Sequence, residues 1–260
     1  YQTKIVINLA AQAGVRHSIK NPKDFITSNL VGFHNILYLS SKYKVKHFVY
    51  ASSSSVYGGN TELPFSENQN VYHPLSLYAA TKKSNELIAH SYSHIYNIPT
   101  TALRFFTVYG PWGRPDMAPM LFANSIINEK PIKVFNNGNM SRDFTYIDDV
   151  AEAIYKCMLK PAEIDLSFDS NNPNPSTSMR PYRILNIGNS KPIKLLDFIE
   201  CLERNIGIKA LKDFQGMQLG DVVDTYADTK NLEKWIKFKP RTTLDVGIRK
   251  FVKWYREYYI

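Results

Sequence analysis

Three short apolar segments separated by helical stretches constrain the fold of this chain more than any other feature. The segments are residues 4–10, 45–51 and 99–106. Each has the length and apolar character of a strand buried on both faces, which is typical of a parallel sheet. Between them, Asn21-Pro22 opens a helix that runs to about Lys42, and residues 76–97 have the pattern of a long helix. This alternation predicts an α/β fold built on a doubly wound parallel sheet.

The carboxyl ends of the three segments are where we expect a site. Small or hydroxyl residues follow all three, namely Leu9-Ala10-Ala11, Ser52-Ser53-Ser54-Ser55 and Thr107. Ligands of doubly wound sheets bind outside the carboxyl ends of the strands. Three strand ends of this kind therefore predict a binding site at one edge of the sheet.

Tyr78 and Lys82 lie four residues apart in the predicted helix 76–97, so they share a face. The ammonium charge lowers the pKa of a neighbouring phenol. The same spacing recurs at Tyr38 with Lys42, interpreted as surface and packing, and at Tyr226 with Lys230, interpreted as a strand end before a helix cap. Only Tyr78 follows a serine cluster and precedes a strand ending at 104–107. We expect Tyr78 and Lys82 to move a proton at a sugar or alcohol oxygen.

The composition indicates a soluble globular protein. The chain has 260 residues, 44% hydrophobic and 21% charged, which is enough to bury a full core. No apolar run approaches the roughly 20 residues of a membrane span, and no signal peptide is visible. Cys157 and Cys201 have no ligand spacing, and the six histidines form no paired motif. We expect buried free thiols, a cytoplasmic location, and neither a metal nor a membrane partner.

A formal charge of +9 points to an anionic partner. The basic residues are spread along the chain, for example at 42–46, 82–83 and 234–239, and form no dense basic arm. No nucleic-acid-binding module is present in the sequence. We therefore expect solvated surface charge and no nucleic-acid partner.

The second half of the chain has longer loops and shorter apolar runs, beginning after Gly110-Pro111-Trp112-Gly113. Its expected elements are a polar loop at 161–181, a strand at 183–188, a helix at 195–204 and a final amphipathic helix at 244–259. We expect residues 1–110 to form one domain and residues 111–260 a smaller α/β substrate lobe. Residues 147–160 and 182–206 are expected to be late elements of the first domain.

Five segments together are similar to a known family. They are Asn8-Leu9-Ala10-Ala11-Gln12-Ala13-Gly14-Val15-Arg16, Ser52-Ser53-Ser54-Ser55-Val56-Tyr57-Gly58, residues 73–82 around Tyr78, residues 104–118 from Arg104 to Ala118, and Arg142-Asp143-Phe144-Thr145-Tyr146-Ile147-Asp148-Asp149-Val150. The chain resembles the extended short-chain dehydrogenase/reductases, in particular the nucleotide-sugar epimerases that act on UDP-glucuronate at C4. The resemblance extends over essentially all 260 residues.

The chain departs from this family at its beginning. The family starts with a strand, a Gly-x-x-Gly-x-x-Gly turn and a helix, which bind the dinucleotide pyrophosphate. No such turn is present, and the first segment of this chain is similar to the family's fourth strand. We expect a Rossmann-type sheet that lacks its first strands and its glycine turn. The missing part would comprise roughly 70 residues. Such a chain keeps the nicotinamide end of the cofactor site and is expected to bind NAD poorly on its own.

The resemblance implies a catalytic cycle with tightly held NAD. Tyr78, as a phenolate, takes the proton of the sugar 4-hydroxyl while hydride leaves C4, and hydride later returns to the opposite face. Lys82 lowers the pKa of Tyr78 and bonds the nicotinamide ribose. Ser53, located 25 residues before Tyr78, holds the 4-oxygen, and Ser54 or Ser55 could share that work.

Other cofactor contacts implied by the resemblance are Leu9, Ala10 and Ala11. Asn29 contacts the catalytic loop or the cofactor, or it is a helix residue that bonds backbone.

The serines also separate this chain from neighbouring chemistries. Related dehydratases carry Thr-Asp-Glu at these places and related decarboxylases a Glu, whereas this chain has Ser53, Ser54 and Ser55. Without a local acid or base, the site can form a ketone and return the hydride but is poorly equipped to eliminate water. This favours epimerisation.

The substrate is expected to be a UDP-hexuronate. Thr107 and the serines can donate to its carboxylate, and Arg16 or Arg114 can supply positive charge there, serve the diphosphate, or lie in solvent. The resemblance places further residues at the UDP end, namely Arg142 on the phosphates, Gln218 with Asp221 near the uridine, and Val134 and Asn136 beside the uracil. Asp221 could instead form a turn after Gly220.

Two alternatives remain open from the sequence. One is a 4-epimerase for UDP-glucose or a UDP-N-acetylhexosamine, and the other is a non-catalytic nucleotide-sugar binding protein. The resemblance also implies a homodimer formed through the helices near 22–42 and 76–97, and a role in carbohydrate metabolism and polysaccharide biosynthesis.

Overall fold

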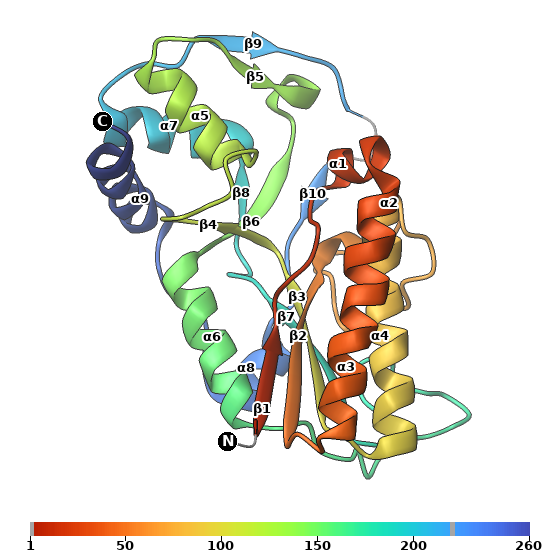
Figure 1. Cartoon of the computed structure of the whole chain (residues 1–260). Helices are drawn as coiled ribbons and strands as arrows, with labels where there is room; N and C mark the ends of the chain where they lie inside the picture. The colour runs from red at the N-terminus through yellow and green to blue at the C-terminus, as the bar shows by residue number, and fades with distance from the viewer. Residues whose placement is uncertain (1–2, 219–221) are drawn as a thin grey trace. The chain divides into compact units, whose positions relative to one another are not determined.

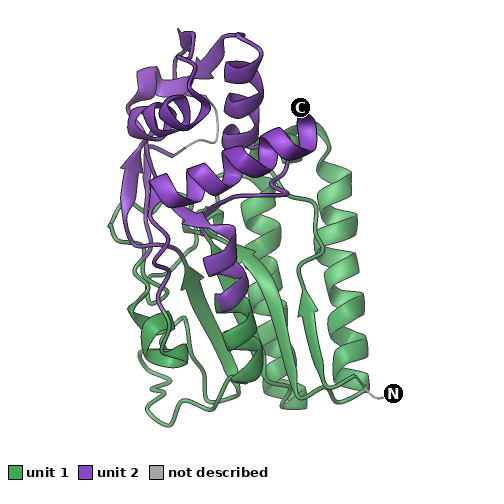
Figure 2. Ribbon diagram, turned by 90° about the vertical axis from the view of Figure 1, so that its left-hand side faces the viewer, with its two compact units in different colours: residues 1–105, 153–187, 228–238 green, residues 106–152, 188–227, 239–260 purple. Residues whose placement is uncertain are grey.

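The structure, a computed structural model, describes residues 3–218 and 222–260. It divides into two compact units, which are coloured separately in Figure 2. Unit 1 comprises residues 1–105, 153–187 and 228–238, and unit 2 comprises residues 106–152, 188–227 and 239–260. Each unit is therefore assembled from three separate segments of the chain.

Unit 1 is built on four parallel strands in the order β1-β2-β3-β7. The strands are β1 (Ile5–Asn8), β2 (His47–Ser53), β3 (Thr100–Phe105) and β7 (Tyr182–Ile187). Their register places Val49 of β2 between Ile7 of β1 and Thr101 of β3. The parallel sheet predicted from the three apolar segments is confirmed, and β7 is the expected late strand.

Helices cover both faces of this sheet (Figure 1). On one face lie α3 (Phe33–Lys42) and α4 (Leu77–Tyr96), which enclose a core that includes Leu37, Phe48, Tyr50, Ala102 and Ile184. On the other lie α8 (Lys230–Ile236) and the part of α6 (Ile147–Leu159) that begins at Ala153. His47 joins α6 to β2 through its Nδ1, 3.0 Å from the carbonyl oxygen of Met158.

The region predicted as one helix from 21 to 42 is more complex. It contains α2 (Pro22–Phe25), a π-helical segment (Ile26–Gly32) and then α3. A further short helix that we did not predict, α1 (Val15–Lys20), precedes it. The prediction was wrong in expecting a uniform helix, because an apolar pattern over so few residues does not distinguish π-helical i→i+5 hydrogen bonds from α-helical ones. π-Helical turns are frequent at functional sites, and this one carries Asn29.

The described residues of unit 2 form two small sheets, three α-helices that lie wholly in this unit, and a short 3-10 helix (Phe135–Gly138). In one sheet the parallel strands β10 (Asp224–Thr225), β6 (Ser141–Tyr146) and β4 (Thr107–Tyr109) are joined by the antiparallel β8 (Pro192–Lys194). The other pairs β5 (Ile132–Val134) with β9 (Lys212–Phe214). The helices are α5 (Ala118–Ile127), α7 (Leu195–Ile206) and α9 (Leu244–Tyr259).

The location of α7 differs from our expectation. We placed residues 182–206 among the late elements of the first domain, but only β7 lies in unit 1, and α7 lies in unit 2. Its buried face packs in the core of that unit, where the ring of Phe198 stacks on Phe144 with centroids 4.2 Å apart. The amphipathic pattern predicted the helix correctly but does not specify which sheet its apolar face covers.

No helix among residues 3–218 and 222–260 is long and apolar enough to cross a membrane. The longest, α4, alternates buried and exposed side chains and is capped at both ends. The Ser76 side chain accepts a hydrogen bond from the backbone N–H of Ala79 (3.1 Å), and Asn97 ends the helix in the left-handed conformation with φ of 53°. The caps explain why the predicted limits of 76 and 97 match the structure.

Replacing Ser76 by Ala should lower the free energy of unfolding by about 1 kcal/mol, because the cap of α4 is lost. Urea unfolding measures this change. Ser91→Ala is the matched control, because the exposed Ser91 donates only to the Ile88 carbonyl of the same helix. A loss from Ser76→Ala no larger than that of the control would contradict the role of the cap.

Candidate active site

Helix α4 presents Tyr78 and Lys82 at its first turns. Lys82 is only 4% exposed, and its Nζ donates to the carbonyl oxygen of Ala51 at 2.8 Å. Tyr78 is half-buried, with its ring edge-on to that of Phe25, 6.1 Å between centroids. Burial lowers the pKa of Lys82 to about 8. The ammonium group is thus fixed beside β2, at a residue two positions before the carboxyl end of that strand.

The serine turn, defined here as residues 52–57, comprises the last two residues of β2 and the 3-10 helix Ser54–Tyr57, and it contacts α4. Ser53 is the last residue of the strand, and its Oγ accepts a hydrogen bond from the N–H of Ser55 at 3.2 Å. Gly58 closes the turn with φ of 51°, where an added Cβ would lie 2.1 Å from the His73 carbonyl oxygen. Only glycine fits there. The structure therefore brings the predicted serines to the helix that carries Tyr78 and Lys82.

Asn29 ties the loop after β1 to α4. Its Oδ1 accepts from the N–H of Gln12 at 2.8 Å, and its Nδ2 donates to the Gln12 carbonyl and to Thr81 Oγ1, both at 3.0 Å. Thr81 in turn donates to the Tyr78 carbonyl at 2.8 Å. Of the roles left open by the sequence, the structure supports bonding to loop backbone. Asn29 thereby fixes the loop that carries the exposed residues 9–11.

A buried ion pair beneath the serine turn was missed by sequence reasoning. Glu86 Oε1 accepts from Ser52 Oγ at 2.7 Å, and Arg104 bonds both carboxylate oxygens, Nε to Oε1 at 2.8 Å and Nη2 to Oε2 at 2.9 Å. Burial raises the pKa of Glu86, but the Arg104 charge and hydrogen bonds outweigh it and hold the pKa below its usual value. The available signal was Arg104 itself, a charge inside an otherwise uncharged strand.

The remaining predicted substrate residue of unit 1, Arg16, is exposed on α1. Two predicted arginines of unit 2 already have protein partners. Arg114 forms a bidentate pair with Asp116, both bonds 2.9 Å. Arg142 donates from Nη1 to the carbonyls of Ser141 and Val223 at 2.8 Å, and from Nη2 to that of Val222 at 2.6 Å.

Other predicted residues of unit 2 occupy strands and turns. Thr107 is half-buried at the start of β4, and Val134 is buried at the end of β5. Asn136 has a left-handed φ of 49°, and its Nδ2 donates to the Asn139 carbonyl at 2.8 Å. Gln218 is half-buried. Asp221 lies outside the described residues.

Asp143 was another residue missed at the sequence level. It is fully buried in unit 2, and its carboxylate accepts from the N–H groups of Asn189 at 2.7 Å, Ser190 at 2.9 Å and Ala227 at 3.0 Å. Burial raises the pKa of Asp143, and these bonds oppose that rise. Asp143 thus joins residues 189–190 and 227 to β6, next to Arg142. Its place in the Arg142-Asp143-Phe144 segment was the only signal.

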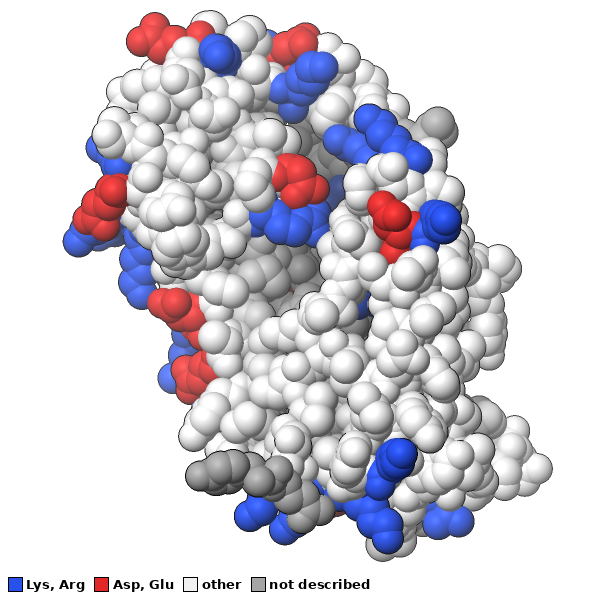
Figure 3. Space-filling model, in the orientation of Figure 1, with Lys and Arg blue, Asp and Glu red and all other residues white. Residues whose placement is uncertain are grey.

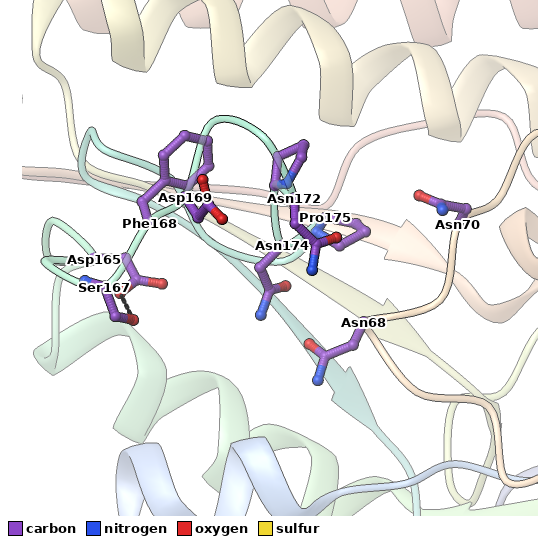
Figure 4. Close-up of a pocket in the computed structure, with 10 residues that line it drawn as sticks. Asn68, Asn70, Asp165, Ser167, Phe168, Asp169, Asn172, Asn174 and Pro175 are labelled. Atoms are coloured by element: carbon purple, nitrogen blue, oxygen red, sulfur yellow. Dashed lines mark hydrogen bonds between the residues drawn. The ribbon is translucent and has the colours of Figure 1, made fainter.

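A surface cavity of about 460 Å³ lies away from these residues, between the loop at 161–181 and the segment containing Asn68 and Asn70 (Figure 4). Asp165 accepts from the hydroxyls of Ser167 and Thr177, both at 2.6 Å. The carboxylate therefore stabilises its own loop. None of the predicted site residues lines this cavity.

Charge and thiols were as the sequence indicated. Lys and Arg side chains occur at several separate places on the face drawn in Figure 3, some of them beside Asp or Glu. Cys157 and Cys201 are free and buried, and burial raises the pKa of Cys157 to about 12. Within the described part of the chain, no three His, Cys, Asp or Glu side chains are grouped to hold a metal ion.

Comparison with known proteins gives the chain its relatives. Residues 1–172 match the family model described as NAD dependent epimerase/dehydratase family. Protein CapI of Staphylococcus aureus is 55% identical over 258 residues, which cover 99% of this chain and 77% of that protein. The "Probable UDP-glucuronate 4-epimerase" of Rhizobium meliloti (strain 1021) is 45% identical over 259 residues, with coverage of 99% and 76%.

Solved structures give the same result for the fold. The crystal structure of UDP-glucuronic acid 4-epimerase from Bacillus cereus, in complex with UDP-glucuronic acid and NAD, superposes with a TM-score of 0.85 and 32% identity. The match covers 98% of this chain and 76% of that one.

The burial of the Lys82 ammonium leads us to predict how the free energy of unfolding depends on pH. Its pKa is about 8 in the folded protein against an ordinary 10.5, so the unfolded chain binds the proton more tightly. Stability therefore rises with pH between these two values. We expect the wild type to gain stability relative to Lys82→Met over this pH range in urea unfolding, because other lysines cancel in the difference. Parallel stability curves for the two proteins would contradict the buried, depressed lysine.

Proposed function

The chain belongs to the NAD dependent epimerase/dehydratase family, and we propose that it inverts C4 of a UDP-hexuronate. The reaction would convert UDP-glucuronate to UDP-galacturonate through a 4-keto sugar. The observation that carries this proposal is a serine turn, without a carboxylate, placed against the helix that bears Tyr78 and Lys82.

NAD is the cofactor of the family, and the residues of unit 1 fit its nicotinamide end. Leu9, Ala10 and Ala11 are exposed after β1, two of them with small side chains, and Asn29 fixes their loop. Lys82 lies near the end of the neighbouring strand β2. These residues would hold the nicotinamide and its ribose. When bound, NAD accepts hydride from C4 and later returns it.

The side chains of unit 1 divide the proton chemistry between them. Tyr78, as a phenolate, accepts the proton of the sugar 4-hydroxyl, and the Lys82 ammonium favours that phenolate. Ser53 donates a hydrogen bond to the 4-oxygen. After the keto sugar has turned over, Tyr78 returns the proton to the same oxygen, now on the inverted carbon.

The absence of an acid from the serine turn argues against water elimination. Dehydration needs a group that protonates the leaving hydroxyl, and residues 52–57 contain only serines, Val56 and Tyr57. The carboxylate that touches the turn, Glu86, is buried and bonded to both Ser52 and Arg104. It is therefore occupied in holding the turn and is not available as a catalytic acid.

The proposed contacts to the UDP-sugar follow from residue type. The hydroxyls of Ser54, Ser55 and Thr107 would donate to the sugar carboxylate, with positive charge from Arg16 or Arg114. At the nucleotide end, the proposed contacts are Arg142 for the phosphates, Val134 and Asn136 for the uracil, and Gln218 with Asp221 for the uridine.

The substrate assignment is tested by supplying UDP-glucuronate to the full-length protein with NAD and following the product by NMR. Formation of UDP-galacturonate supports the proposal. Conversion of UDP-glucose or a UDP-N-acetylhexosamine, with UDP-glucuronate unchanged, would overturn the uronate assignment. A protein that binds UDP-sugars without converting any of them would be a binding protein.

Replacing Tyr78 by Phe should lower kcat by about 100-fold or more, because the proton acceptor is lost. UDP binding, measured by calorimetry, should stay unchanged. Tyr38→Phe is the matched control, since Tyr38 also lies four residues before a lysine but is exposed on α3. Loss of folding or of UDP binding in Tyr78→Phe would make Tyr78 a structural residue.

A homodimer formed through α3 and α4 is part of the proposal. Both helices expose large apolar side chains, among them Ile36, Leu39, Leu87 and Ile95. Removing such groups from water favours association.

We also propose that the reaction takes place in the cytoplasm and supplies a sugar precursor for polysaccharide biosynthesis.

Leu87→Glu should dissociate the dimer, because a charge then replaces an apolar side chain that is 61% exposed in the single chain. Sedimentation velocity measures the change in mass. Leu166→Glu is the control, because Leu166 is 96% exposed in the loop at 161–181. A wild type that sediments as a monomer, or a dimer insensitive to Leu87→Glu, would contradict this interface.

A further inference from the structure

One buried ion pair holds both ends of the serine turn. At its first residue, Ser52 Oγ donates to Glu86 Oε1 at 2.7 Å. At its last, the ring of Tyr57 lies under the Arg104 guanidinium, 4.9 Å from the centroid to Cζ. Glu86 and Arg104 are bonded to each other, and both side chains are fully buried. The residues between these ends are Ser53, Ser54, Ser55 and Val56.

The geometry of this pair is directional. Arg104 and Glu86 meet through two parallel hydrogen bonds, a bidentate arrangement that fixes the plane of both groups. Buried ion pairs of this kind are poor sources of stability, because desolvation offsets their attraction. An apolar pair of similar volume would serve packing equally well. The feature that an apolar pair lacks is the acceptor for Ser52.

Tyr57, the last residue of the serine turn, is itself bonded to β7. The hydroxyl of Tyr57 donates to Asn186 Oδ1 at 2.7 Å, and its ring stacks on Phe65 at 4.5 Å. The N–H of Asn186 donates to the buried Glu67 at 2.7 Å. Tyr57 therefore cannot rotate without breaking its hydrogen bond to β7, the last strand in the order β1-β2-β3-β7, and the serine turn is fixed from both sides.

Two residues of α4 that lie one helical turn apart bond two successive residues of β2. Lys82 bonds the carbonyl of Ala51, and Glu86 accepts from the side chain of Ser52. The next residue, Ser53, is the last of the strand, and its Oγ accepts from the N–H of Ser55 at 3.2 Å. The position of its hydroxyl is then set by the two bonds that precede it. A shift of about 1 Å at a reacting group can cost on the order of 100-fold in rate.

We propose that Glu86 and Arg104 are positioning residues, which act through Ser52 and Tyr57 to place the Ser53 hydroxyl at the sugar 4-oxygen. This inference rests on the proposed function, because it gives Ser53 its role there. It assigns Ser52 a different task from the three serines that follow it.

Ser52→Ala tests the inference with the smallest change. It removes the hydroxyl that Glu86 accepts and leaves the ion pair in place. We expect kcat to fall about tenfold or more with KM and UDP affinity unchanged. Ser52→Thr, which keeps a hydroxyl, should restore most of the rate. Ser40→Ala is the matched control, because Ser40 is a buried serine that donates only to its own helix at Ile36, and it should leave kcat unchanged.

A double variant separates positioning from general destabilisation. If Ser52 acts through Ser53, then Ser52→Ala with Ser53→Ala should be no slower than Ser53→Ala alone. Losses that multiply, or a kcat for Ser52→Ala within twofold of wild type, would overturn the inference. Activity of the wild type on UDP-glucose in place of UDP-glucuronate would overturn the uronate assignment instead. The kcat values of the same variants, measured on UDP-glucose, would then still decide the role of Ser52.

Discussion

The hydrogen bond from the Lys82 ammonium to the carbonyl of Ala51 is the interaction on which the proposed chemistry depends. It joins the helix that carries Tyr78 to the end of the strand that carries Ser53. Burying the ammonium group costs free energy, and this cost appears as a pKa of Lys82 that burial lowers to about 8. A protein selected for stability alone would place an apolar side chain there. We attribute the buried cation to its proposed task, which is to favour a phenolate one helical turn away.

The elements around this bond were largely predictable from sequence. Helix α4 was expected at 76–97 and is found at Leu77–Tyr96, since Ser76 and Asn97 are strong caps. Helix α9 was expected at 244–259 and is found there, because its apolar residues recur on one face. The parallel strands followed from their apolar character. The π-helical segment was not predictable, because the residue spacing of one wide turn differs too little from that of an α-helix.

The site was predictable where chemistry is local in sequence and not where it depends on distant partners. Tyr78 and Lys82 share a helix, and the serine turn is continuous. The pairing of Glu86 with Arg104 and the contact from Arg104 to Tyr57 join three elements, α4, β3 and the serine turn, that no spacing rule connects. The same holds for Asp143, whose donors at 189, 190 and 227 lie far along the chain. For Arg104 the indication available was a charge inside an otherwise uncharged strand, and for Asp143 it was the Arg142-Asp143-Phe144 segment.

In the proposed reaction, hydride leaves C4 of the sugar and returns to the same carbon, while Tyr78 transfers only the oxygen-bound proton. The most direct measurement uses UDP-glucuronate that carries deuterium at C4, incubated in ordinary water with the full-length protein and NAD. We expect UDP-galacturonate that retains deuterium at C4, because the carbon-bound hydrogen never exchanges with solvent. A product that has lost the deuterium to water would contradict it, since inversion would then proceed by removing C4 hydrogen as a proton.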